Sequence, residues 1–343
     1  MSDLVFGLDT FGDVPEDDSG VLVSHGRSIR QTVAEAVLAD DLGVDVLALG
    51  EHHRPEYSVS TPETVLAGIA TRTRRIRLSS GVTVLSSDDP VRVFQRFATL
   101  DALSEGRAEI ILGRGSFTES FPLFGYDLAD YDVLFEEKLD LFVRLLKEEP
   151  VTWKGTVRAP LDNAEVYPTT ESGRLPTWVG VGGSPQSVVR TARHGLPLMI
   201  AIIGGAPTRF APYIDLYERA TAQFGTTAHP VAMHSPGFVA DTDEEAREAH
   251  WPGYRVIRDR IGALRGWPSV RREEYEAEIA HGSMYVGSPE TVARKIAAAV
   301  RTLQVGRFDL IYTSGSQSVS NRLRSVELYG TKVIPMVRDL LAG

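Results

Sequence analysis

The chain has 343 residues, a formal net charge of −10 and no cysteine. The acidic balance argues against nucleic acid or an anionic membrane as the main partner. Without cysteine, disulfides, thiolate catalysis, iron–sulfur clusters and cysteine zinc sites are excluded. The N-terminal segment lacks the basic and apolar regions of a secretion signal, and no stretch is apolar enough to cross a bilayer, so we expect a cytoplasmic protein.

Short apolar segments alternate along the chain with segments of helical periodicity. The apolar segments predict strands at residues 5–8, 44–49, 76–85, 108–112, 177–181, 198–203, 231–239 and 308–313. The other segments predict helices at residues 28–42, 61–73, 90–103, 134–148, 185–194, 243–260 and 289–303, and helices that end near 224 and 341, with Ser28 capping the first. This alternation fits a closed (β/α)8 barrel better than an open sheet. We predict one domain over residues 1–343, with insertions near residues 151–175 and 261–285.

Three polar residues, Glu51, His52 and His53, directly follow the strand predicted at residues 44–49. An α/β barrel presents its catalytic side chains at the carboxyl ends of its strands. Successive strand residues point to opposite sides, so Glu51 and His53 should share one side and His52 should take the other. An imidazole titrates near neutral pH, which suits His52 or His53 to general acid or base catalysis. The alternative is a histidine that is only hydrogen-bonded at the barrel rim.

The sequence does not predict a metal site. A barrel hydrolase requires two histidines on the same face of a strand, and the chain contains no His-x-His pair. The remaining histidines are scattered, at His25, His194, His229, His234, His250 and His281.

The strand predicted at residues 108–112 ends in Gly113, Arg114 and Gly115. Glycines let a ligand approach the backbone closely, and the planar guanidinium group of arginine matches a phosphate. A tight turn with a solvated arginine is the alternative interpretation.

A second glycine-rich motif, residues 180–187, lies between a strand and a helix. The free N–H groups at a helix N-terminus bind phosphate, and Gly182 and Gly183 carry no side chain to block the approach. Ser184 and Ser187 can each add a hydroxyl group. Ser184 can also be a simple N-cap, and the two roles are compatible.

Neither motif is a dinucleotide-binding fingerprint. The pattern Gly-x-Gly-x-x-Gly would need a third glycine where Pro185 and Thr118 stand. A single phosphate is a better match than a pyrophosphate, so FMN or a sugar phosphate fits better than NAD.

Taken together, these features resemble the bacterial luciferase-like family of flavin-dependent monooxygenases. The resemblance covers most of the chain and is clearest over residues 42–125. Its motifs are Glu51-His52-His53, residues 81–85, residues 89–92, residues 100–107, Gly113-Arg114-Gly115 and Phe124-Gly125. Each motif alone is weak, and their order and spacing make the resemblance specific.

The resemblance implies a cofactor site made of Gly81, Val82, Thr83, Arg114, Gly182, Gly183, Ser184 and Ser187. Within this site a non-prolyl cis peptide between Gly81 and Val82 would support the flavin ring, and Arg114 would contact the phosphate. His52 would match the histidine assigned as acid or base beside the flavin.

The chain departs from the family pattern in two places. Gly113 stands where bacterial luciferase has a reactive cysteine, which argues against light emission with an aldehyde. Residues 130–132, Asp-Tyr-Asp, stand where bacterial luciferase has a second phosphate-binding arginine. The second departure implies phosphate binding that is weaker or made by other groups, which is consistent with a flavin that arrives as a diffusible cosubstrate.

The sequence therefore predicts an FMN-dependent monooxygenase that uses reduced flavin and dioxygen on an unidentified small organic substrate. Because the chain has no nicotinamide fingerprint, we expect a separate reductase to supply the reduced flavin, and the resemblance suggests a homodimer. The alternatives are an F420-dependent oxidoreductase on the same fold, a non-catalytic flavin-binding protein and, last, a metal-dependent barrel hydrolase.

Three loops, residues 54–60, 117–132 and 261–285, are expected to select the substrate. One of them is rich in aromatic side chains that suggest an apolar pocket wall. These are Phe117, Phe121, Phe124 and Tyr126.

Overall fold

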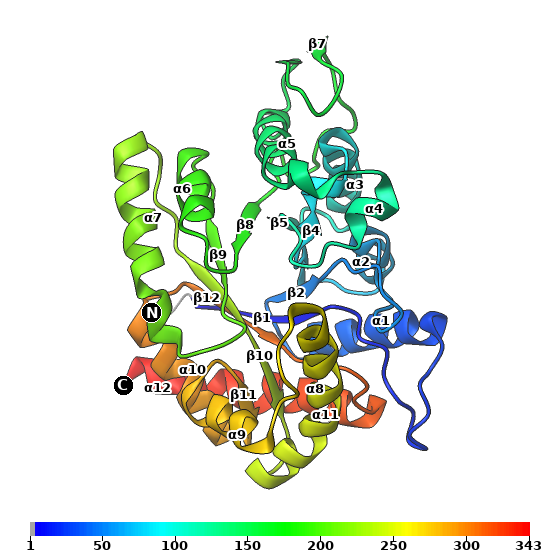
Figure 1. Ribbon diagram of the computed structural model, residues 1–343, viewed down its shortest axis with the longest axis vertical. Helices are drawn as coiled ribbons and strands as arrows, with labels where there is room; N and C mark the ends of the chain where they lie inside the picture. The colour runs from blue at the N-terminus through cyan, green and yellow to red at the C-terminus, as the bar shows by residue number, and fades with distance from the viewer. Residues whose placement is uncertain (1–3) are drawn as a thin grey trace.

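Within residues 4–343, which the computed structural model describes, eight parallel strands close into a barrel (Figure 1). They are β1 (Val5–Thr10), β2 (Val46–Leu49), β3 (Arg77–Ser80), β5 (Ala108–Gly113), β8 (Thr177–Val181), β9 (Leu198–Ala201), β10 (Ala232–Val239) and β12 (Arg307–Ile311). Each strand pairs with the next in this order, and β12 pairs with β1 to close the ring. The predicted (β/α)8 barrel is confirmed.

Helices cover the outside of the barrel (Figure 1). They are α1 (His25–Asp41), α2 (Pro62–Ala70), α3 (Pro90–Leu103), α4 (Ser120–Phe124), α5 (Tyr131–Leu145), α6 (Pro185–Arg193), α7 (Ala211–Phe224), α8 (Asp243–Arg265), α9 (Arg272–His281), α10 (Pro289–Leu303), α11 (Val319–Leu328) and α12 (Ile334–Ala342). Short helical turns are η1 (Leu85–Ser87), η2 (Leu128–Asp130), η3 (Pro207–Phe210) and η4 (Tyr329–Val333). The predicted cap at Ser28 is wrong by one turn, because the side chain of Ser24 accepts from the N–H of Arg27 and starts α1 there.

The strand predicted over residues 76–85 is interrupted. β3 ends at Ser80, the peptide bond between Gly81 and Val82 is cis, and pairing with β5 resumes in β4 (Thr83–Val84). The first predicted insertion contains the antiparallel hairpin of β6 (Val151–Trp153) and β7 (Leu161–Ala164), at the top of Figure 1. The second is largely helical, since it contains the end of α8 and all of α9, and it leads into β11 (Tyr285–Gly287), which pairs with β10.

The inside of the barrel carries a buried ion network. The guanidinium group of Arg307 donates to Asp309 Oδ2 at 2.7 Å and to Glu109 Oε1 at 2.5 Å. All three side chains are at most 2% exposed. Burial alone would lower the pKa of Arg307, but the adjacent carboxylates of Asp309 and Glu109 outweigh it and raise that pKa. The outward face of the strands is apolar. Leu8 on β1, for example, is buried in the hydrophobic core.

His250 on α8 lies in a buried aromatic cluster with Tyr254 and Tyr275, on which its ring stacks. Its Nδ1 is 3.1 Å from the hydroxyl group of Tyr275, and its Nε2 has no partner among residues 4–343. Burial lowers the pKa of His250 to about 3. The folded protein therefore holds this imidazole uncharged well below the pH at which an unfolded chain protonates it.

This buried imidazole predicts acid destabilisation. Its stabilising contribution is fully present above the unfolded pKa of 6.5 and is lost as the pH falls toward 3, because only the unfolded chain then takes up the proton. When the pH is lowered from 7.5 to 5.5, we expect His250 to reduce the free energy of unfolding by about 1 kcal/mol. Urea unfolding of the wild type and of His250→Phe at both pH values measures this, and equal losses in the two proteins would contradict it.

Candidate active site

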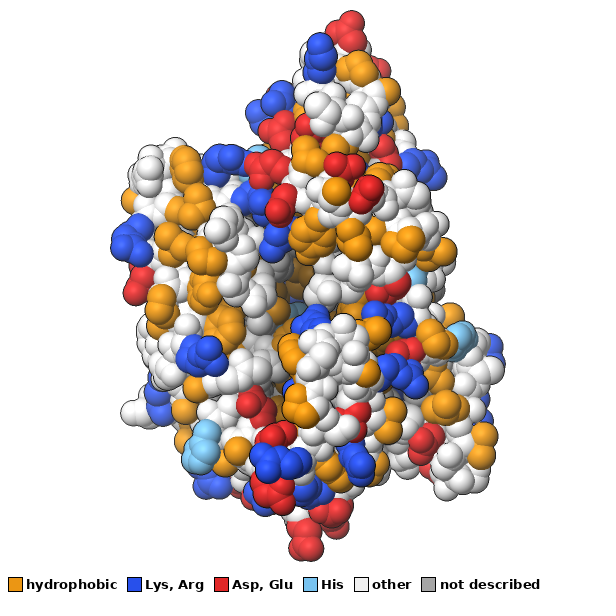
Figure 2. All heavy atoms as spheres, in the orientation of Figure 1, with side chains coloured by type: hydrophobic (Ala, Val, Ile, Leu, Met, Phe, Trp, Pro, Cys, Tyr) orange, Lys and Arg blue, Asp and Glu red, His pale blue; other side chains and the backbone are white. Residues whose placement is uncertain are grey.

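The loops that follow β2, β3, β5 and β8 meet at the carboxyl end of the barrel. These four strands are neighbours in this order. His52, Gly81, Arg114 and Ser184, which follow the four strands, are therefore arranged one after another along one side of the rim. Figure 2 shows the surface hollowed here, between α6 and α7 on one side and α3 to α5 on the other.

His52 lies in a cage of aromatic rings. Its imidazole stacks on Tyr57, with 4.4 Å between the ring centroids. Phe11 and Phe117 meet the imidazole edge-on at 5.0 and 4.9 Å. The side chain of His52 is only 11% exposed. The cage therefore removes most water from the imidazole.

The loop before α4 closes over this cage. Glu119 Oε1 lies 3.2 Å from Arg54 Nε and 4.0 Å from His52 Nδ1. Burial, with smaller contributions from the positive charges of Arg54 and His53, lowers the pKa of His52 to about 3. The imidazole is therefore uncharged at neutral pH, and its pKa lies below the near-neutral value expected from the sequence.

Glu51 and His53 do share one side, as strand alternation predicts. His53 Nε2 is 3.0 Å from Glu51 Oε1. The other carboxylate oxygen of Glu51 accepts from the N–H of Val84 at 2.8 Å. Glu51 therefore ties the end of β2 to β4, and it positions the segment that carries the cis peptide.

The side chain of Val82 fills the space between β5 and β8. A Cβ atom at Gly113 would lie 2.5 Å from Val82 Cγ2, and one at Gly180 would lie 2.9 Å from Val82 Cγ1. The glycine that replaces the luciferase cysteine is therefore required by packing. Thr83 is buried, and its hydroxyl group donates to Ser80 Oγ at 2.9 Å, so that hydroxyl is already used within the barrel.

Adding a methyl group at Gly113 is expected to destabilise the protein. Gly113→Ala should cost about 1–3 kcal/mol through overpacking against Val82, and Gly113→Ala/Val82→Ala should recover most of that loss. Gly182→Ala is the matched control, since a Cβ atom there meets nothing within 4 Å. Chemical denaturation measures all three variants. Equal stability of Gly113→Ala and the wild type would contradict the packing argument.

The residues predicted to bind a phosphate lie at the N-terminus of α6. Ser184 is the N-cap, and its hydroxyl oxygen accepts from the N–H of Ser187 at 3.4 Å. Gly183 has a φ of +121°, which a side chain would strain, and its carbonyl accepts from Tyr213 at 2.9 Å. Gly182 leaves open space in front of the helix.

Arg190, one turn further along α6, joins this group and is not among the residues predicted from sequence. Its Nη1 lies 3.4 Å from Ser187 Oγ. Burial lowers the pKa of Arg190, and the positive charge of Arg114 lowers it further. The i, i+3 spacing from Ser187 was the available signal, because such residues share one helix face. Arg190 therefore places a second guanidinium group beside the N-terminal turn of α6.

Carboxylates on α5 already pair with these arginines. Asp132 Oδ1 lies 2.9 Å from Arg114 Nη1. Glu136 forms close ion pairs with Arg190 and Arg193. An incoming anion must therefore compete with internal partners for both arginines.

Comparison with known proteins identifies the family. A sequence model of luciferase-like monooxygenases matches residues 11–305. The chain belongs to the luciferase-like monooxygenase family. This membership confirms the predicted family and the monooxygenase class.

Relatives of this luciferase-like chain differ in cofactor. The chain is 30% identical to 4-hydroxyprotoasukamycin monooxygenase of Streptomyces nodosus subsp. asukaensis, over 93% of this chain and 89% of that protein. The oxygenating constituent of 3,6-diketocamphane monooxygenase from Pseudomonas putida, solved with FMN, matches with a TM-score of 0.74, 19% identity and coverage of 97% and 98%. F420-dependent tetrahydromethanopterin reductase from Methanopyrus kandleri matches with a TM-score of 0.72, 19% identity and coverage of 97% and 99%. The fold thus occurs in FMN and F420 proteins alike.

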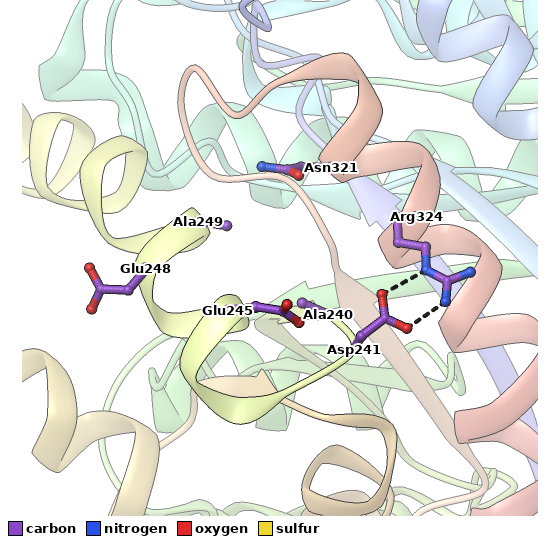
Figure 3. Close-up of a pocket in the computed structure, with 7 residues that line it drawn as sticks. All are labelled: Ala240, Asp241, Glu245, Glu248, Ala249, Asn321 and Arg324. Carbon is purple, nitrogen blue, oxygen red and sulfur yellow. Dashed lines mark hydrogen bonds and ion pairs between the residues drawn. The ribbon is translucent and has the colours of Figure 1, made fainter. Parts of the chain in front are cut away.

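A second hollow of this luciferase-like protein lies between α8 and α11 (Figure 3). It is lined by Ala240, Asp241, Glu245, Glu248, Ala249, Asn321 and Arg324. The single arginine is paired with Asp241, and the other charged groups are carboxylates. This hollow is therefore unsuited to a phosphate.

Two further findings concern the part of the chain that the structure describes. Over residues 4–343 there is no group of three or more histidine, aspartate and glutamate side chains placed to hold a metal ion. None of the helices in that range combines the length and apolar character needed to cross a membrane.

Proposed function

We propose that this protein is an FMN-dependent monooxygenase that uses the reduced cofactor and dioxygen to oxygenate a small organic substrate. One observation carries the proposal. Hydrogen-bond donors on α6 and after β5, the cis peptide between Gly81 and Val82 and a caged imidazole follow one another along one side of the barrel mouth.

The residues present fit a flavin phosphate. Arg114 and Arg190 supply charge-assisted donors, and Ser184 and Ser187 add hydroxyl groups at a helix N-terminus. Gly182 has no neighbour where a Cβ atom would stand, so a ligand can approach the backbone. Such a donor set suits the phosphate monoester of FMN.

The flavin ring would lie against Gly81 and Val82, with His52 beside it. Reduced flavin supplies the two electrons that let dioxygen react, so that one oxygen atom enters the substrate and the other leaves as water. Tyr57 and Phe117 exclude bulk water from this space. His52, held uncharged, would accept a proton at a ring nitrogen and return it afterwards.

The internal ion pairs support a cofactor that binds weakly and exchanges. FMN would have to displace Asp132 from Arg114 and Glu136 from Arg190. We therefore propose that a separate reductase supplies the reduced flavin. Oxygen consumption with NAD(P)H and FMN should depend on an added flavin reductase, and turnover without one would contradict this.

The cofactor assignment is tested by binding and turnover. FMN and F420 are titrated separately into the purified protein, followed by fluorescence, and oxygen uptake is then measured with reduced FMN. Tighter binding of FMN together with oxygen uptake that differs in rate from that of reduced FMN without protein is the expected result. Tighter binding of F420 would favour the F420-dependent alternative, and FMN binding with oxygen uptake no different from that of free reduced FMN would favour a flavin-binding protein.

We also propose a homodimer, on the family resemblance alone. Sedimentation velocity at micromolar concentration tests it, and a monomer throughout would contradict it. The cytoplasmic location stays a prediction.

A further inference from the structure

The inside of the barrel contains a second imidazole. His234 lies on β10, and in the register of the sheet it is level with Asp309 of β12 and Ala201 of β9. Its Nδ1 is 2.8 Å from Asp9 Oδ2, across 225 positions of sequence. Asp9 is fully buried near the carboxyl end of β1. Barrel closure alone brings this pair together.

Asp9 lies directly beneath the cis peptide. A Cβ atom at Gly81 would be 3.0 Å from each carboxylate oxygen of Asp9. Oδ1 of Asp9 is sealed from solvent and has no hydrogen-bond partner among residues 4–343. A buried, unpaired acceptor of this kind costs about 1–3 kcal/mol. If the Asp9–His234 pair served only to stabilise the fold, an unpaired oxygen that lowers the free energy of unfolding would not be expected there.

The contact with Asp9 involves only one ring nitrogen of His234. Where the Asp9 carboxylate accepts from Nδ1–H, Nε2 carries no proton and is left as an acceptor. Among the described residues Nε2 has no hydrogen-bond partner, yet it is not one of the side-chain nitrogens sealed from solvent. The side chain retains 6% exposure. Burial raises the pKa of the Asp9 carboxyl group, the contact with His234 lowers it, and of the other charged groups Asp309 raises it and Arg307 lowers it.

We propose that Asp9 and His234 form a dyad whose open Nε2 accepts a proton from an N–H or O–H group of a molecule bound over Gly81. The proton moves from that group to Nε2, and Asp9 stabilises the imidazolium that results, without a covalent bond to the protein. The dyad is a second proton-handling group, separate from the caged His52. Only its assignment to flavin chemistry rests on the proposed function.

The first test needs neither cofactor nor variant. In the ¹⁵N-labelled protein, long-range ¹H–¹⁵N spectra should show His234 as the Nδ1–H tautomer with a bare Nε2. Asp9→Asn should reverse this, because an amide N–H then donates to Nδ1. A wild-type ring protonated at Nε2 would overturn the dyad, whatever the protein does with flavin.

The second test separates proton transfer from binding. Asp9→Asn and His234→Gln should lower kcat for the oxidation of bound reduced FMN by about 100-fold or more. The Kd for FMN should change less than threefold. His250→Gln removes another buried histidine and should leave kcat unchanged. If the wild type oxidises reduced FMN and both dyad variants keep its kcat, the dyad is wrong. If the wild type does not bind FMN, the proposed function fails, and the tautomer measurement still decides the dyad.

Discussion

Replacing Arg307 with methionine is expected to lower the free energy of unfolding by about 3–5 kcal/mol. The substitution leaves Glu109 and Asp309 as buried carboxylates without their shared cation. Removing one member of a buried ion pair costs more than the pair itself contributes, because the remaining charge keeps its desolvation penalty. Urea unfolding, with a check that the slope is unchanged, measures the loss.

Arg77→Met is the matched control for this prediction. Arg77 also reaches Glu109, at 3.3 Å, but its side chain is 38% exposed, so water can replace the bond. We expect a cost of about 1 kcal/mol or less. Similar losses for Arg77→Met and Arg307→Met, or a loss below 1 kcal/mol for Arg307→Met, would show that the network does not stabilise the barrel as argued.

Removing the two arginines of the proposed phosphate site should weaken FMN binding strongly. Arg114→Ala and Arg190→Ala should each raise the Kd for FMN by about 10-fold to 100-fold, since a hydrogen bond to a charged group contributes about 1.5–3 kcal/mol. Flavin fluorescence titration at fixed ionic strength measures the change.

Riboflavin, which lacks the phosphate, is the control ligand. Its affinity should be nearly the same in the wild type and in both variants. Asp132→Asn should act in the opposite direction and tighten FMN binding, because it removes the internal partner of Arg114. Arg144→Ala, an exposed arginine paired with Asp140 on α5, should change neither ligand. Equal losses for FMN and riboflavin would mean that the arginines act on the protein structure and not on the phosphate.

Much of this site is predictable from local sequence. Ser184 and Pro185 mark the start of α6, and strand alternation places Glu51 and His53 together. The resemblance anticipates the cis peptide at Gly81–Val82. Each of these signals acts over a few residues of chain, through a cap, a strand period or a short motif.

Other features depend on side chains that meet only in the folded barrel. Arg190 reaches Ser187 on its own helix, but its nearness to Arg114 requires β5 and β8 to be neighbours. The low pKa of His52 depends on burial by Tyr57 and Phe117, which lie on two different loops. The sequence pattern does not predict how far these two loops bury the imidazole of His52.

By itself, the sequence determined the alternation of strands and helices and the family, and it predicted a site at the carboxyl ends of the strands. These follow from hydrophobic periodicity, capping and motif order, which are local properties. The tertiary structure alone decided that Val82 needs glycine at position 113, that Asp132 faces Arg114, and that Asp9 meets His234. Each of these contacts exists because closing the barrel brings distant segments within a few ångströms of one another, and that closure is set by the packing of the whole chain.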